Sequence, residues 1–233
     1  MATSLTPDPQ PILSRLGILP EYLRRMPPGP RRTQCRAVIN WLTRYRARRP
    51  SESNALGGIG SADYATGDYT SAKTHFEQQL EIAKEMGDRS TQAHALGALG
   101  NVCLSLKQYA QALEFHQQHL AIAQSLGLRR SILHAIGDIG NTYVLLEDLT
   151  QATECYQQQI AIAQEIGDHT GEAIALGNLG AIAYDLGNES SAIRLIQQQL
   201  SIAQELGDRN QINRALHNLE KIEALQLSNA ASS

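Results

Sequence analysis

The chain has 233 residues, of which 42% are hydrophobic and 5% aromatic, and its formal net charge at pH 7 is −3. This composition is sufficient for a helical core of small aliphatic side chains, and the lack of any run of about 18 apolar residues excludes a membrane-spanning helix. Residues 1–50 carry ten arginines against two acidic residues, a charge of +8, whereas the remainder carries −11. The asymmetry indicates a basic arm on an acidic body.

All eight prolines lie in the first 50 residues of the chain. Residues 1–33 are therefore interpreted as a proline- and arginine-rich N-terminal arm. Residues 34–50 are predicted to form an amphipathic helix, because their apolar side chains recur at helical spacing. We expect this helix to be an N-terminal cap, since a stack of repeats needs its first apolar face covered.

From residue 51 onward the sequence repeats every 40 residues without an insertion. Glycines mark the period in three series: Gly87, Gly127, Gly167 and Gly207; Gly57, Gly97, Gly137 and Gly177; Gly60, Gly100, Gly140 and Gly180. Four full repeats are predicted at 51–87, 88–127, 128–167 and 168–207. A fixed period in this range is typical of a solenoid, in which each unit contacts only its neighbours.

Each repeat is predicted to be a pair of helices. In residues 88–127, Asp88 is a plausible N-cap of the first helix, and Lys107 begins the turn that precedes the second. Gly97 and Gly100 stand inside the first helix, where each glycine costs about 1 kcal/mol relative to alanine. Because every repeat carries both glycines, we interpret them as points of close helix–helix approach.

After Gly207 the pattern of paired glycines stops. A final helix ending near residue 227 is predicted to cap the array, because His217 and Glu220 stand where the repeats have glycine. Residues 228–233 are predicted to be a disordered tail.

The third repeat reads Ile139-Gly140-x-x-Tyr143, followed by Ala152 and the aromatic residue Tyr156, and this pattern resembles the tetratricopeptide repeat. The 40-residue length, the string LGNLG at 176–180 and the IAQExGD endings resemble its Leu-Gly-Asn subfamily, which is common in bacterial and especially cyanobacterial-like proteins. The resemblance implies an all-α fold, a right-handed superhelical α-solenoid of helix-turn-helix repeats.

One departure from the family concerns the second helix, where the repeat pattern has alanine and this chain has Gln79, His119, Gln159 and Gln199. Either the helices tilt slightly apart here, or these polar side chains hydrogen-bond between repeats. A buried polar group without a partner costs about 1–3 kcal/mol. We therefore expect the four side chains to be hydrogen-bonded or partly exposed.

The resemblance implies that the first helices line a concave groove, with groove asparagines binding the backbone of an extended peptide. Asn101 and Asn141 match that position, and asparagine offers a donor and an acceptor to a peptide unit. The predicted groove residues are Asn54, His94, Asn101, His134, Asp138, Asn141, Asn178, Arg214 and Asn218. The alternative interpretation is a solvated helix face with no ligand.

No motif indicates catalysis, a cofactor or a metal site. His94 and His134 occupy the same row of adjacent repeats, but neighbouring helices lie about 8–10 Å apart, which is long for two ligands of one ion. The three cysteines, Cys35, Cys103 and Cys155, have no metal or redox spacing and indicate reduced thiols. With no apolar signal segment, we expect a cytoplasmic protein. Because no motif indicates catalysis, we expect that it is not an enzyme.

The leading hypothesis is a protein–protein interaction scaffold that holds a peptide or a partner helix in its groove. The alternative is a regulatory or assembly factor whose basic arm binds nucleic acid, an anionic membrane surface or an acidic protein. Ten arginines near Trp41 and Tyr45 would suit phosphates and bases. The acidic repeats would repel a polyanion, so nucleic acid is the less favoured partner. The sequence leaves homo-oligomerisation open.

Overall fold

The computed structural model describes residues 29–231, apart from the side chains of 30–36, 38–48 and 225–231. The chain divides into two compact units, Met1–Glu52 and Ser53–Ser233. Most of the predicted basic arm and the apolar face of the predicted capping helix lie outside the described residues, as do the last two residues of the predicted tail.

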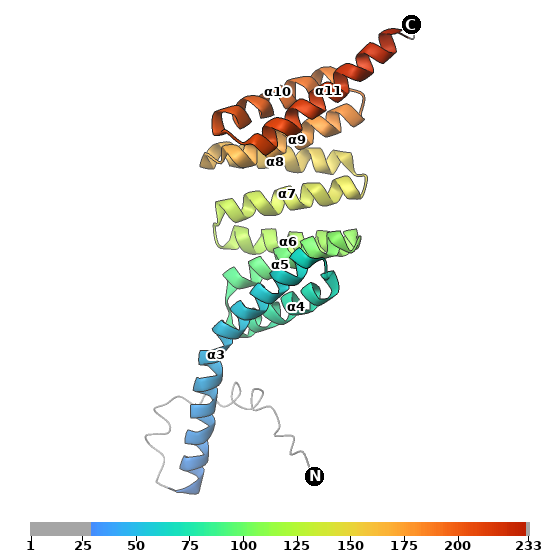
Figure 1. Cartoon of the computed structure of the whole chain (residues 1–233). Coiled ribbons are helices and arrows are strands. Elements are labelled where there is room, and N and C mark those ends of the chain that lie inside the picture. The colour runs from blue at the N-terminus through green and yellow to red at the C-terminus, as the bar shows by residue number, and fades with distance from the viewer. Residues whose placement is uncertain (1–28, 232–233) are drawn as a thin grey trace. The chain divides into compact units, whose positions relative to one another are not determined.

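The described part of the chain forms nine α-helices and no strand. They are α3 (Pro30–Thr66), α4 (Tyr69–Met86), α5 (Arg89–Ser105), α6 (Tyr109–Ser125), α7 (Arg129–Leu145), α8 (Leu149–Ile166), α9 (His169–Asp185), α10 (Glu189–Leu206) and α11 (Arg209–Ala231). From α4 onward each helix packs on the next one in the chain, as the stacked helices of Figure 1 show. The predicted all-α solenoid of helix pairs is confirmed.

Two helix boundaries differ from those expected from the sequence. Helix α3 runs through Pro50, where we expected one helix to end and the first repeat to begin. Proline removes one intrahelical hydrogen bond, and the division between the two units falls close by, after Glu52. Helix α11 extends to Ala231, into the predicted tail. No glycine or proline follows Gly207 to end this helix, and alanine favours its continuation.

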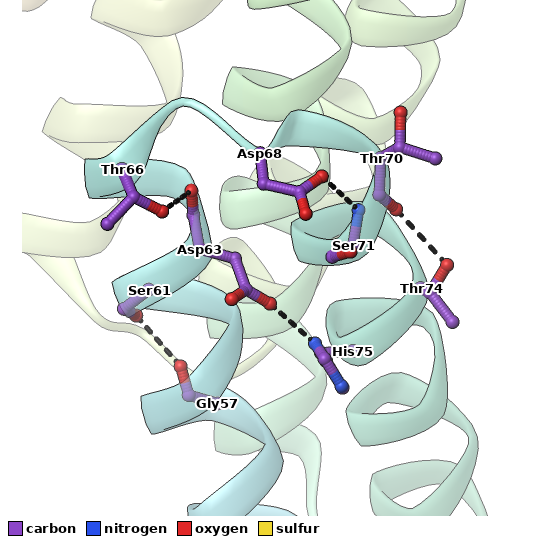
Figure 2. Close-up of polar contacts among 9 residues, drawn as sticks. All are labelled: Gly57, Ser61, Asp63, Thr66, Asp68, Thr70, Ser71, Thr74 and His75. Carbon is purple, nitrogen blue, oxygen red and sulfur yellow. Dashed lines mark hydrogen bonds and ion pairs between the residues drawn. The ribbon is translucent and has the colours of Figure 1, made fainter.

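Side-chain caps and left-handed glycines set the helix ends. The Asp68 carboxylate accepts a hydrogen bond from the Ser71 amide at 3.0 Å at the start of α4, as Figure 2 shows. Gly87 ends that helix at φ 68°, in the left-handed conformation that glycine adopts without steric cost. The same close-up shows His75 Nδ1 2.7 Å from Asp63 Oδ2, a polar contact that joins α4 to α3.

The second glycine of each repeat faces one large side chain of the second helix. A Cβ added at Gly100 would lie 2.3 Å from the His116 ring, and one added at Gly140 would lie 2.8 Å from the Tyr156 ring. Phe76 and Ile196 occupy the same position against Gly60 and Gly180. These four side chains are at most 2% exposed. The interpretation of these glycines as points of close helix packing is confirmed.

The first glycine of each repeat faces the polar residue that departs from the family pattern. Two of these residues bond to the next repeat: His119 Nε2 lies 2.8 Å from Ser131 Oγ, and Gln199 Nε2 donates to Gln211 Oε1 at 2.8 Å. However, the Oε1 atoms of Gln79, Gln159 and Gln199 and the Nδ1 of His119 are buried without a hydrogen-bond partner.

The expectation that these side chains are hydrogen-bonded or partly exposed therefore holds only in part. His119 and Gln199 each bond to the next repeat, but all four side chains are at most 8% exposed and keep one buried polar atom without a partner. The physical reason lies in the facing glycines. A glycine opens the space that the amide or ring fills, but the backbone of a helix interior has already used its N–H groups and has none to donate.

Candidate functional site

The predicted groove face of each first helix is the side that neighbouring helices do not cover. In α5, most residues between Gln92 and Cys103 are buried. His94 is exposed and Asn101 half-buried on the same stripe. Helix α7 repeats the pattern, with His134 and Asn141 exposed and Asp138 half-buried. Neighbouring helices therefore cover the other sides and leave a polar stripe on each first helix.

The largest described cavity lies between the stripes of α5 and α7 and has a volume of about 660 Å³. It brings together four of the predicted groove residues, His94, Asn101, His134 and Asp138. Further lining residues that sequence reasoning did not select are Ser90, His119, Leu128, Arg130 and Ser131. The cavity thus spans the junction of the second and third repeats.

Two further cavities continue along the first helices toward the N-terminal side. One, of about 440 Å³, is lined by Asn54, Ser61, Gln79 and His94. The other, of about 160 Å³, is lined by Tyr64, Phe76, His94 and Asn101. His94 borders all three cavities, so it is the predicted residue with the most access to whatever occupies this face.

In the third and fourth repeats the predicted groove residues bond to one another instead. The buried Tyr156 hydroxyl donates to Asn141 Oδ1 at 2.7 Å. Asn178 Nδ2 is 3.4 Å from the same oxygen, and Arg214 Nη2 donates to Asn178 Oδ1 at 2.9 Å. These contacts link α7, α8, α9 and α11. They engage Asn141, Asn178 and Arg214, which the sequence analysis assigned to a ligand, in hydrogen bonds within the protein.

Asn218 remains apart from both groups. It is half-buried on α11 and lines none of the described cavities. Apart from Asn218, the predicted residues divide into those that line cavities, namely Asn54, His94, Asn101, His134 and Asp138, and those that are hydrogen-bonded, namely Asn141, Asn178 and Arg214.

Burial shifts the pKa of Asp138, which lines the main cavity, and that of His116 on α6. Burial raises the pKa of Asp138 to about 6. Burial, with a smaller effect from His119, lowers the pKa of His116 to about 4. Their closest approach is 3.9 Å between His116 Nδ1 and Asp138 Oδ2, too long for a hydrogen bond. His116 is therefore neutral at pH 7, and its two ring nitrogens have no hydrogen-bond partner.

The residues that sequence reasoning missed come mainly from second helices and from helix starts. His119 and Tyr156 reach the groove face from α6 and α8, and Arg130 and Ser131 lie at the first turn of α7. The polar residues opposite the repeat glycines could have indicated this, because a polar side chain at a position of close helix packing is expected to reach toward the groove face. Nothing in the sequence distinguishes Arg130 from other exposed arginines.

The sequence matches the profile of the tetratricopeptide repeat over residues 51–125 and 130–205. The chain belongs to the tetratricopeptide repeat family. Repeats of this family are in general protein–protein interaction modules that bind proteins or peptides, and they are typically non-catalytic scaffolds. No curated protein sequence matches the chain.

Several solved structures share the fold. BtubC (BKLC) from P. vanneervenii aligns with a TM-score of 0.64 and 14% identity, over 84% of this chain and 87% of that one. Aspartyl phosphate phosphatase F from Bacillus subtilis aligns with a TM-score of 0.69 and 16% identity, over 78% of this chain and 51% of that one. A Rap protein complexed with competence and sporulation factor aligns with a TM-score of 0.65 and 18% identity, over 78% of this chain and 51% of that one. The tetratricopeptide chain thus spans about half the length of the latter two.

The described residues contain neither a metal-binding cluster nor a membrane-spanning helix. Among them, no group of three or more histidine, cysteine, aspartate or glutamate side chains could hold a metal ion. No helix in the same part of the chain is long and apolar enough to cross a membrane.

Proposed function

We propose that this tetratricopeptide chain is an interaction scaffold that binds an extended peptide or a partner helix along α3, α5 and α7. The observation that supports this proposal best is the row of three separate cavities along these helices, all of which His94 lines. Unpaired donors and acceptors such as Asn101 line these cavities, whereas Asn141, Asn178 and Arg214 are engaged with one another. We therefore assign ligand contact to the first three repeats.

We also propose that the protein acts in a reducing, cytoplasmic compartment. Cys103 and Cys155 are free thiols in the structure. Burial raises the pKa of both thiols, which keeps them protonated and unreactive. This supports an interpretation of the two cysteines as core residues.

Peptide selection tests the proposed function directly. An array of random ten-residue peptides probed with the full chain should yield a reproducible subset of bound sequences. The Asn101→Ala variant should bind those peptides about five- to tenfold more weakly, because it loses hydrogen bonds worth about 1 kcal/mol. The Asn210→Ala variant, which changes an exposed asparagine at the start of α11, is the matched control and should bind like the wild type.

Asn141→Ala should behave differently from Asn101→Ala. It leaves the buried Tyr156 hydroxyl without its acceptor, so it should lower thermal stability more than it lowers peptide affinity. Equal losses of affinity for both asparagine variants, with unchanged melting temperatures, would contradict the assignment of the ligand to the first three repeats.

A further inference from the structure

The carboxamide of Gln79 lacks the hydrogen-bond partner that two equivalent side chains have. His119 Nε2 lies 2.8 Å from Ser131 Oγ, and Gln199 Nε2 donates to Gln211 Oε1 at 2.8 Å. In both pairs the partner is twelve residues further along the chain, in the first turn of the next repeat. The same polar position of the second helix is therefore joined to the next repeat in these two cases.

At Gln79 the residue twelve positions further along is Thr91, and its hydroxyl group is already engaged. Thr91 Oγ1 donates to Asp88 Oδ2 at 2.7 Å. No hydrogen bond joins the Gln79 carboxamide to any described residue, although only 4% of Gln79 is exposed. Because buried polar groups are normally hydrogen-bonded, this side chain indicates a ligand group that the described chain does not supply.

The unpaired carboxamide lines the cavity of about 440 Å³ between α3 and α5. Oε1 is the buried atom without a partner in Gln79 and in Gln199 alike. The Nε2 of Gln79 therefore points the same way as the Nε2 of Gln199, toward the next repeat. Ser90 and Thr91 line the cavity on that side, so Gln79 offers an amide donor to whatever occupies it.

Two hydroxyl groups of the same cavity can only accept a hydrogen bond from an occupant. Ser61 Oγ donates to the Gly57 carbonyl oxygen at 2.8 Å, as Figure 2 shows, and Thr91 Oγ1 donates to Asp88. A hydroxyl group has one hydrogen, so both oxygens have only lone pairs left. A matching occupant thus needs an acceptor for Gln79 and two donors for Ser61 and Thr91.

A primary carboxamide meets this requirement, and charged groups do not. It has one acceptor oxygen and two N–H donors, whereas a backbone peptide unit has a single N–H. A carboxylate has no hydrogen for either hydroxyl group and would be repelled by Asp88 beside Thr91. An ammonium group cannot accept from Gln79, and none of the described lining residues is an aspartate or glutamate that would pair with it.

We infer that this cavity binds the primary carboxamide of a glutamine or asparagine side chain of the partner peptide. The carboxamide oxygen accepts from Gln79 Nε2, and its N–H groups donate to Ser61 Oγ and Thr91 Oγ1. The partner thereby supplies the bond that Ser131 and Gln211 supply to the equivalent side chains. This inference rests on the proposed function and specifies one residue type of the ligand.

The test removes the carboxamide of Gln79 and keeps most of its volume. Peptides selected from the random array are resynthesised in sets of three, with each Gln or Asn retained, replaced by apolar Met or Leu, or replaced by Glu or Asp. Isothermal titration calorimetry gives their dissociation constants for the wild type, Gln79→Met and Gln159→Met. Gln159→Met is the matched control, because Gln159 also has a buried Oε1 without a partner but lines none of the described cavities.

The wild type should bind the amide member of a set about tenfold more tightly than either replacement, the range expected for one or two hydrogen bonds. Gln79→Met should reduce the preference over the apolar member to about threefold or less, because only the two hydroxyl acceptors remain. Gln159→Met should keep the tenfold preference. Both variants should melt no lower than the wild type, since each replaces an unpaired buried group by an apolar one, and this excludes misfolding as the cause.

Three results would overturn the inference. If Gln79→Met keeps the tenfold preference, the carboxamide does not bind at Gln79. If the acidic member binds as tightly as the amide member, or the selected peptides show no preference for Gln or Asn, the ligand chemistry is wrong while peptide binding stands. If the wild type selects no peptide at all, the proposed function fails together with this inference.

Discussion

The residue His116 shows how one position of the repeat sets a local property. The equivalent residues of the other repeats are Phe76, Tyr156 and Ile196, and all four fill the space that a glycine leaves in the facing helix. Phenylalanine and isoleucine fill it without polar atoms, and Tyr156 has Asn141 for its hydroxyl. Only at His116 do two ring nitrogens lie buried without a partner.

This burial predicts an acid-sensitive second repeat. The pKa of His116 is lowered from 6.5 to about 4. Above pH 6.5 the residue is neutral in both the folded and unfolded states, so its packing contributes fully. Between pH 6.5 and 4 the unfolded state takes up a proton that the folded state does not. The stability is therefore lost as the pH falls, by about 2 kcal/mol between pH 7 and pH 5.

The variant His116→Phe should be more stable than the wild type at pH 7 and should lack this acid-dependent loss. Urea unfolding at pH 7, 6 and 5 measures both effects. Asp138, whose pKa is raised to about 6, has the opposite sign: the folded state takes up its proton first, so stability is gained as the pH falls through 6. Asp138 is present in both the wild type and His116→Phe, so the difference between their free energies of unfolding reports on His116 alone. A gap that stays constant from pH 7 to 5 would contradict the prediction.

At the scale of the element, the turns inside the repeats differ in strain. Gly67 and Gly187 adopt φ of 85° and 75°, whereas their counterparts in the second and third repeats are Lys107 at 58° and Glu147 at 62°. A residue with a Cβ pays about 1–2 kcal/mol for the left-handed conformation. The middle two repeats thus keep the helix-turn-helix geometry against a local preference, because packing of the flanking helices determines the turn.

Lys107→Gly should therefore stabilise the protein by about 0.5–1 kcal/mol, which is the relief of the left-handed strain less the greater freedom of glycine in the unfolded chain. The reciprocal change, Gly187→Ala, should destabilise it by a similar amount. No atom lies within 4 Å of an added Cβ at Gly187, so only backbone strain operates there. Thermal unfolding measures both variants, and shifts in the same direction would show that strain does not govern these turns.

At the scale of the whole molecule, the second unit is held together by contacts between consecutive helices. Among its described residues, four apolar clusters follow one another along the array. The one nearest the C-terminal end combines Ala192 and Ile196 of α10 with Ala215 and Ile222 of α11. Helix α11 thus covers the last repeat in the way that each repeat covers the one before it.

A chain that ends at Gly207 should lose protection locally rather than uniformly. Removal of α11 exposes Ile196 and frees Gln199 from its partner Gln211, so the amides of α9 and α10 should exchange with solvent faster. Those of α5 and α6 should keep their wild-type exchange. Hydrogen-exchange mass spectrometry on both chains makes the comparison. Equal acceleration in every repeat would mean that the array unfolds as one cooperative unit.

Much of this architecture follows from the sequence alone. The 40-residue period, the paired glycines and the lack of proline after Pro50 determine a stack of helix pairs, because local propensity and helical periodicity act over a few residues. The stripe that contains His94, Asn101, His134 and Asp138 is assigned to an open face through the resemblance to the family. In the structure these four residues line the main cavity, and their contact with a ligand stays a prediction.

What only the tertiary structure decided is which side chains of that stripe remain available to a ligand. Asn101 and Asn141 are equivalent in sequence, yet Asn101 borders a cavity and Asn141 holds the hydroxyl of Tyr156. Likewise, His119 Nε2 and Ser131 Oγ, from successive repeats, lie 2.8 Å apart, and both residues line the main cavity. These contacts join residues from different helices and repeats, and their distances depend on how the helices pack, which no local pattern in the chain specifies.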